Sequence, residues 1–166
     1  MSCRLFKHEK FSNMRSSFFR ENAKEILFFL NLKKCSFNLS LILNDEMKYL
    51  NNLFRQKDKA TDILSFRSQF DATESKSPKQ FLCQKQLGDI YIAPFYFKQK
   101  LGLNPNCNLE NCALKVENYM RLLIVHGFLH LVGWDHSDEM ETMENIVLER
   151  CKIKSPKHRL FGGLLY

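Results

Sequence analysis

The sequence is poor in residues that interrupt regular structure or cross-link a small scaffold. Six glycines and four prolines in 166 residues exclude a collagen-like repeat and a scaffold made only of loops. The six cysteines include no C-x2-C pair, so nothing supports a zinc ribbon or a thioredoxin-like redox motif. Thiols scattered in this way are typical of a reduced protein, and we expect a cytoplasmic location.

Long apolar runs are also missing. No segment approaches the roughly 20 apolar residues of a membrane-spanning helix, and the longest candidate, 122–132, carries two histidines. The first ten residues carry charges where a secretory signal has an apolar core, so we expect no signal peptide and no membrane partner. Hydrophobic residues make up 45% of the chain, which excludes a disordered chain and is enough for one packed domain over 1–166.

The spacing of apolar side chains predicts a mixture of helices and short strands. Helices are expected over 15–32, 44–56, 94–101, 113–132 and 138–151, and strands over 36–43, 62–66 and 87–93. Polar stretches at 68–85 and 104–111 are expected to be loops. Because helices and strands do not alternate in a strict βαβ order, the sequence predicts the α+β class, with a small mixed sheet flanked by helices.

The most informative segment is HGFLHLVGWDH at 126–136. His126 and His130 are four residues apart on a predicted helix, so both imidazoles project from one face. Gly133 allows the chain to reverse after the helix and to return His136 toward the same point. Catalytic zinc sites have three protein ligands and leave a fourth position for water. We therefore predict one Zn²⁺ per chain, bound by His126, His130 and His136.

A single histidine on a core helix is more often an ordinary polar residue than a ligand. Three histidines within eleven residues, with a glycine at the turn, favour a metal site instead. Asp135 next to them is either a hydrogen-bond acceptor for a ligand imidazole or a residue that stabilises the turn.

The spacing H-x3-H-x2-G-x2-H also occurs in the metzincin proteases, which carry glutamate directly after the first histidine as general base. Here that position is Gly127, so a peptidase would lack its proton acceptor. A doubly charged cation on three neutral ligands acidifies water and neutralises an anionic transition state, and a phosphodiester gains most from that charge. The site chemistry therefore favours phosphoryl transfer to water.

Basic residues outnumber acidic ones by 25 to 18, which gives a net charge of +7. They gather in 1–34 and 150–159, and clusters of this kind attract polyanions in a salt-dependent manner. Charge alone is explained equally well by solubility, but next to a hydrolytic metal site it favours RNA. Arg55 is either a bidentate phosphate ligand or a solvated residue at the end of a helix.

Three motifs in this chain resemble the YbeY family of metal-dependent endoribonucleases. HGFLHLVGWDH at 126–136 is similar to the family's HGxLHLxGYDH signature, NNLFRQKDKATDILSF at 51–66 to its N-x-x-[YF]-R-x-K-D-x-P-T-[DN]-V-L-S-F block, and LGDIYI at 87–92 to its LGDIVI strand. Together they span about 51–136. The chain departs from the family pattern at Ala60 and Arg67, which replace prolines and predict a looser loop beside an RNA groove, and at Trp134, which replaces tyrosine.

The resemblance implies a zincin-like α+β domain with one zinc on three histidines and endoribonuclease activity on single-stranded RNA. It also implies 16S rRNA 3′ end maturation and ribosome quality control, with the small ribosomal subunit and its assembly factors as partners, in the bacterial cytoplasm or an organelle. The family's ligands fall on His126, His130 and His136, and its functional arginine falls on Arg55. A zinc metallopeptidase and a non-catalytic ribosome-assembly factor are the alternatives.

Overall fold

The computed structural model describes residues 2–68, 86–103 and 113–150. The predicted loops at 68–85 and 104–111 lie almost wholly outside the described residues. The same holds for most of the basic tail at 150–159 and for four of the cysteines, Cys83, Cys107, Cys112 and Cys151. Within the described ranges, no helix combines the length and the apolar character that crossing a membrane requires.

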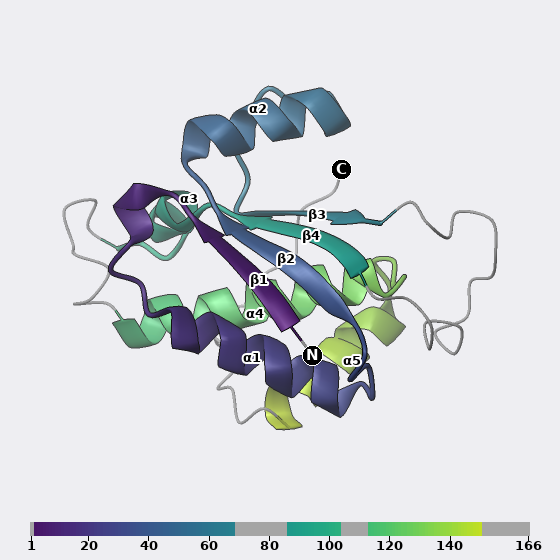
Figure 1. The fold of residues 1–166 in the computed structure, drawn as a ribbon. Helices are drawn as coiled ribbons and strands as arrows, with labels where there is room; N and C mark the ends of the chain where they lie inside the picture. The colour runs from purple at the N-terminus through teal and green to yellow at the C-terminus, as the bar shows by residue number, and fades with distance from the viewer. Residues whose placement is uncertain (1, 69–85, 104–112, 151–166) are drawn as a thin grey trace.

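A four-stranded mixed sheet forms the centre of the fold (Figure 1). Its order is β1 (Ser2–Lys7), β2 (Ser36–Leu41), β4 (Gln86–Ile92) and β3 (Ile63–Arg67). β1 and β2 are parallel, as are β2 and β4, whereas β3 runs antiparallel to β4. β3 is therefore an edge strand, at the opposite edge from β1.

Helices cover both faces of the sheet unequally. One face carries α1 (Ser16–Phe29), α4 (Ala113–Leu131) and α5 (Asp138–Arg150), and the other carries α2 (Asn44–Arg55), as Figure 1 shows. A 3-10 turn, η1 (Glu9–Phe11), follows β1, and α3 (Pro94–Lys100) follows β4. α4 packs against β3 and β4 and is covered in turn by α1 and α5. The predicted α+β class, with a mixed sheet, flanking helices and a buried central helix, is confirmed.

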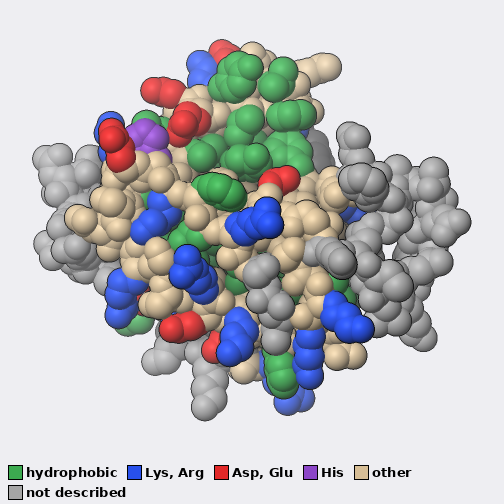
Figure 2. Space-filling model, viewed as in Figure 1, with side chains coloured by type: hydrophobic (Ala, Val, Ile, Leu, Met, Phe, Trp, Pro, Cys, Tyr) green, Lys and Arg blue, Asp and Glu red, His purple; other side chains and the backbone are tan. Residues whose placement is uncertain are grey.

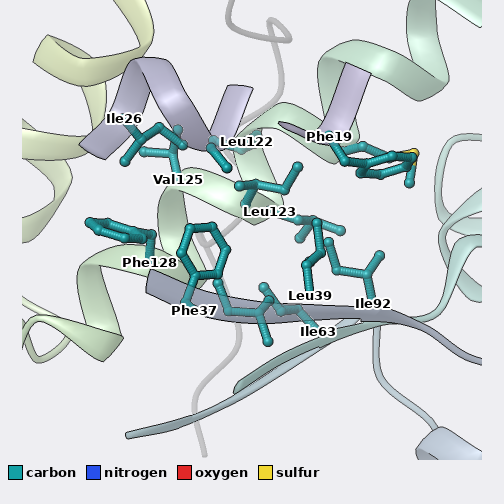
Figure 3. Packing of buried hydrophobic residues seen from close by; sticks show 14 of the residues in the cluster. Phe19, Ile26, Phe37, Leu39, Ile63, Ile92, Leu122, Leu123, Val125 and Phe128 are labelled. Carbon is teal, nitrogen blue, oxygen red and sulfur yellow. The ribbon is translucent and has the colours of Figure 1, made fainter. Parts of the chain in front are cut away.

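The main hydrophobic core lies between the sheet and α4 (Figure 3). Every residue of α4 from 122 to 129 is buried, which explains why its second half is apolar on all sides. Phe37 of β2 and Phe128 of α4 meet edge to face, with ring centroids 5.3 Å apart. On β3, Ile63 joins this core whereas Leu64 points to a smaller cluster beneath α2, as the alternation of a strand requires.

The predicted helices and strands are all present, with ends that differ by up to three residues. The sequence analysis missed β1, in which the side chains of residues 3–7 are half-buried or exposed and the apolar signal is therefore weak. The looser loop expected at Arg67 is not found. Arg67 is the last residue of β3 and is paired with Gly88 of β4, so the strand continues through the position where the family carries proline.

A buried carboxylate ties α4 to the start of β3. Tyr119 of α4 donates its hydroxyl proton to Asp62 Oδ2 at 2.6 Å, and Lys100 Nζ lies 3.0 Å from the same oxygen. Burial alone raises the pKa of Asp62, but the hydrogen bond from Tyr119 and the positive charge of Lys100 outweigh it and leave that pKa below its ordinary value. The ionised form of Asp62 therefore stabilises the folded state.

Replacing Asp62 with asparagine is expected to lower the free energy of unfolding at pH 7 by about 1.5–3 kcal/mol, as for hydrogen bonds to charged groups. A depressed pKa contributes stability above the unfolded value of about 3.9, and this contribution is lost as the pH falls through the folded value. The gap between wild type and Asp62→Asn should therefore close below about pH 4 in urea titrations. Asp58→Asn, which removes an exposed partner of Lys48, is the matched control and should have little effect. A gap that is independent of pH would contradict this account.

Candidate metal centre

The first two histidines of the motif lie one turn apart on α4. His126 is buried and His130 is half-buried, and their Nε2 atoms are 3.1 Å apart. Position 127 faces a different way, because a Cβ added to Gly127 would lie 2.8 Å from Ile63 Cδ1 and 3.1 Å from Ile90 Cγ2. Glycine at this position lets α4 lie close to the sheet, and a glutamate there would meet β3 and β4.

The third histidine returns to the pair through a tight turn. The backbone of Gly133 has a φ of +95°, which favours glycine, and its N–H donates to the His130 carbonyl at 3.1 Å. The ring centroid of His136 consequently lies 4.5 Å from that of His130 and 5.2 Å from that of His126. One nitrogen from each of the three imidazoles falls within 4.8 Å of the others.

Hydrogen bonds at the Nδ1 atoms of His126 and His130 set the direction in which the Nε2 lone pairs of the two rings point. His130 Nδ1 lies 2.8 Å from the Trp134 carbonyl oxygen, and His126 Nδ1 lies 3.2 Å from Glu144 Oε1. Both partners are acceptors, so we assign the ring proton to Nδ1 in each case. Both Nε2 lone pairs then point at one place, where they repel each other unless a cation lies between them.

The donor set fits a tetrahedral zinc ion. Two nitrogens bound to zinc at about 2.0–2.1 Å lie about 3.3 Å apart at the tetrahedral angle, close to the 3.1 Å found between the two Nε2 atoms. Among the described residues, the cluster includes no fourth histidine, cysteine or carboxylate ligand. His136 is exposed, so a fourth position would face solvent.

The surroundings keep two of the rings neutral at physiological pH. Burial is the largest cause that lowers the pKa of His130 to about 4, and electrostatic repulsion from the neighbouring His126, His136 and Arg55 would disfavour its charged form further. Burial, His126 and Arg55 also lower the pKa of His136. Neutral imidazole is the form that binds a metal, so neither ligand has to release a proton at pH 7.

Two arginines approach the cluster from different elements. Arg55 is the exposed last residue of α2, and its charge acts on both His130 and His136. Arg67, at the end of β3, packs against the turn after α4, because a Cβ on Gly133 would lie 3.2 Å from Arg67 Nη1. The fold therefore brings the predicted Arg55 within electrostatic range of His130 and His136. It also places Arg67, noted above only as a departure from the family pattern, against the glycine of the turn between His130 and His136.

The carboxylate partner of His126 is Glu144 of α5, which the sequence analysis did not single out. Asp135, considered there for a similar role, is exposed and acts on His136 through its charge. A signal for Glu144 is present in the sequence: it belongs to the buried stripe of α5 with Met140, Val147 and Leu148. A carboxylate among apolar residues of one helix face indicates a buried polar partner.

Comparisons with known proteins agree with the three motifs. A sequence profile described as Endoribonuclease YbeY matches residues 5–152. An Endoribonuclease YbeY from Francisella philomiragia is 34% identical over 121 residues, which cover 72% of this chain and 69% of that protein. One from Francisella tularensis subsp. holarctica is 32% identical over 114 residues, which cover 68% of this chain and 63% of that protein.

A solved structure shares the fold. The solution structure of TM1509 from Thermotoga maritima matches with a TM-score of 0.56 and 22% identity, over 95% of this chain and all of that one. This similarity concerns the fold alone. The profile match, which covers most of the chain, and the curated relatives show that the chain belongs to the Endoribonuclease YbeY family.

Proposed function

We propose that this chain is a zinc-dependent endoribonuclease that hydrolyses phosphodiester bonds in single-stranded RNA. The observation that carries the proposal is the convergence of the two Nε2 lone pairs, 3.1 Å apart, beside an exposed third imidazole and within the field of Arg55. His126, His130 and His136 would hold the ion, one per chain. A zinc ion bound there would supply Lewis-acid chemistry, acidifying water and offsetting phosphate charge.

Other residues of the chain bind the phosphate and orient the imidazole ligands. Arg55 binds a phosphate oxygen and balances the charge that develops as the bond breaks, because its guanidinium is permanently charged and donates two parallel hydrogen bonds. Glu144 and the Trp134 carbonyl hold protons on the Nδ1 atoms of His126 and His130, which keeps both rings in one orientation. A general base is not assigned to any side chain.

The biological role that we propose follows the family. We expect the substrate to be small-subunit rRNA, with action in 16S 3′ end maturation and ribosome quality control. The partners would then be the small ribosomal subunit and its assembly factors, and the location the cytoplasm. We propose that residues 1–166 act as one domain.

Two observations weigh against the alternatives. A metzincin-type peptidase needs a glutamate at position 127, where any side chain would run into Ile63 and Ile90. A non-catalytic assembly factor with a structural zinc would close the ion's coordination shell, whereas the side of His136 is open to solvent.

The test uses the purified full chain. We expect about one zinc per chain by elemental analysis, cleavage of a single-stranded RNA that a chelator stops and added zinc restores, and slower cleavage of the same sequence in a duplex. Nickel would be compared with zinc, because imidazole ligands accept both ions. RNA cleavage that persists with the chelator, or cleavage of a peptide pool in place of RNA, would refute the proposal.

A further inference from the structure

Helix α2 exposes an unusual amount of apolar surface. Its side chains Tyr49, Leu53 and Phe54 are 66%, 57% and 58% exposed, and only Met47 and Asn51 are buried. Hydrophobic side chains gather over α2 and the neighbouring strands in Figure 2. Large apolar side chains grouped on a surface indicate a contact site.

Phe54 is held in place without being covered. Its ring packs against that of Phe66 on β3, with centroids 4.6 Å apart and planes inclined by 53°, and Phe66 in turn meets Tyr91 of β4 edge-on at 5.8 Å. More than half of the Phe54 side chain nevertheless faces solvent. A ring that is fixed on one side and open on another is suited to stack with a further planar group.

An arginine directly follows each ring of this pair. Phe54 precedes Arg55, whose charge reaches His130 and His136, and Phe66 precedes Arg67, whose guanidinium packs against Gly133. The ring pair therefore lies at the β3 edge of the sheet, and the cation that follows Phe54 is within electrostatic range of the candidate metal centre. An exposed ring followed by a cation matches a base and the adjacent phosphate of single-stranded nucleic acid.

We propose that Phe54, supported by Phe66, is a stacking platform for the unpaired base next to the phosphate that Arg55 binds. This inference rests on the proposed ribonuclease function and assigns the source of its preference for single strands. A base within a duplex already has both faces covered by its neighbours, so it cannot use the platform. Charge favours RNA over an apolar protein partner as the occupant, because Arg55 adjoins the ring.

The test is steady-state cleavage of a fluorescent single-stranded oligoribonucleotide by Phe54→Leu in the full, zinc-loaded chain. Leucine keeps an apolar contact with Phe66 but cannot stack, so we expect KM to rise about tenfold or more with little change in kcat, and Phe54→Tyr to restore the wild-type value. Cleavage of the matching duplex by Phe54→Leu should be unchanged. Because only single-strand cleavage weakens, the preference of the enzyme for single strands should fall.

Phe28→Leu is the matched control. Phe28 is 60% exposed and also lies beside a cation, Lys33, but it belongs to α1, which packs at the β1 edge of the sheet. The Phe28→Leu enzyme should cleave the single-stranded RNA with the wild-type KM and kcat. A Phe54→Leu enzyme with wild-type KM for the single-stranded oligoribonucleotide would overturn the inference.

A second measurement separates this inference from the proposed function. Fluorescence anisotropy of a labelled ten-nucleotide adenine oligoribonucleotide reports binding whether or not cleavage occurs. Weaker binding by Phe54→Leu than by Phe28→Leu would support the platform even if the wild type cleaved no RNA, a result that would refute only the nuclease proposal. Equal binding by the two variants would overturn the platform even in an active nuclease.

Discussion

Replacing His130 with alanine should remove metal binding and RNA cleavage together. The substitution deletes one of two Nε2 donors that are 3.1 Å apart, and two imidazoles do not hold zinc in a tetrahedral site. A bound metal contributes several kcal/mol of transition-state charge stabilisation, so we expect cleavage to fall by about 100-fold or more. Elemental analysis and an RNA cleavage assay on the same preparation measure both losses.

Two further variants make this result interpretable. His136→Ala removes an exposed ligand and should cause the same losses without disturbing the core, whereas His8→Ala removes a histidine beside η1 and should retain zinc and activity. Circular dichroism and urea titration check that each variant folds. A folded His130→Ala chain that keeps full RNA cleavage would contradict the metal centre as the reaction site. One that lacks cleavage but still supports ribosome assembly would favour the assembly-factor alternative.

Replacing Arg55 with alanine should separate metal binding from catalysis. Arg55 lies at the end of α2 and is exposed, so the variant should fold and bind zinc as wild type does. Removing one positioned donor from a charged transition state costs about 10²–10³ in kcat. Single-turnover cleavage of a single-stranded RNA measures this loss independently of product release.

Two control variants distinguish a specific phosphate contact by Arg55 from a general effect of positive charge on RNA cleavage. Arg20→Ala removes the same side chain from an exposed position on α1 and should leave kcat unchanged. Arg55→Lys keeps the charge but loses the bidentate geometry, and we expect it to recover only part of the activity. If Arg55→Ala cleaved RNA at the wild-type rate, Arg55 would have no place in the mechanism.

The sequence could predict what depends on local spacing. Helices and strands followed from apolar periodicity, because each element buries one face or, in α4, nearly all of it. The proximity of His126 and His130 followed from a separation of four residues on one helix. The return of His136 followed from Gly133, whose positive φ the turn requires.

Contacts between distant segments could not be predicted in the same way. Glu144 reaches His126 from the next helix, and Arg67 reaches Gly133 from an edge strand, so both pairings depend on how α4, α5 and β3 pack. The pairing of β1 with β2 is likewise long-range and leaves β1 half-exposed, without a clear apolar stripe. Position 127 is a similar case. The sequence showed only that glycine replaces the glutamate base of the metzincins, whereas the structure shows that glycine lets α4 pack closely against Ile63 and Ile90.

X-ray absorption spectroscopy at the zinc edge of the zinc-loaded full chain tests the metal centre most directly. The proposed site predicts three imidazole nitrogens at about 2.0–2.1 Å and one oxygen from solvent, and no zinc retained by His136→Ala. A coordination shell that contains sulfur or a fourth protein ligand, or a His136→Ala chain that binds zinc with the wild-type shell, would contradict it.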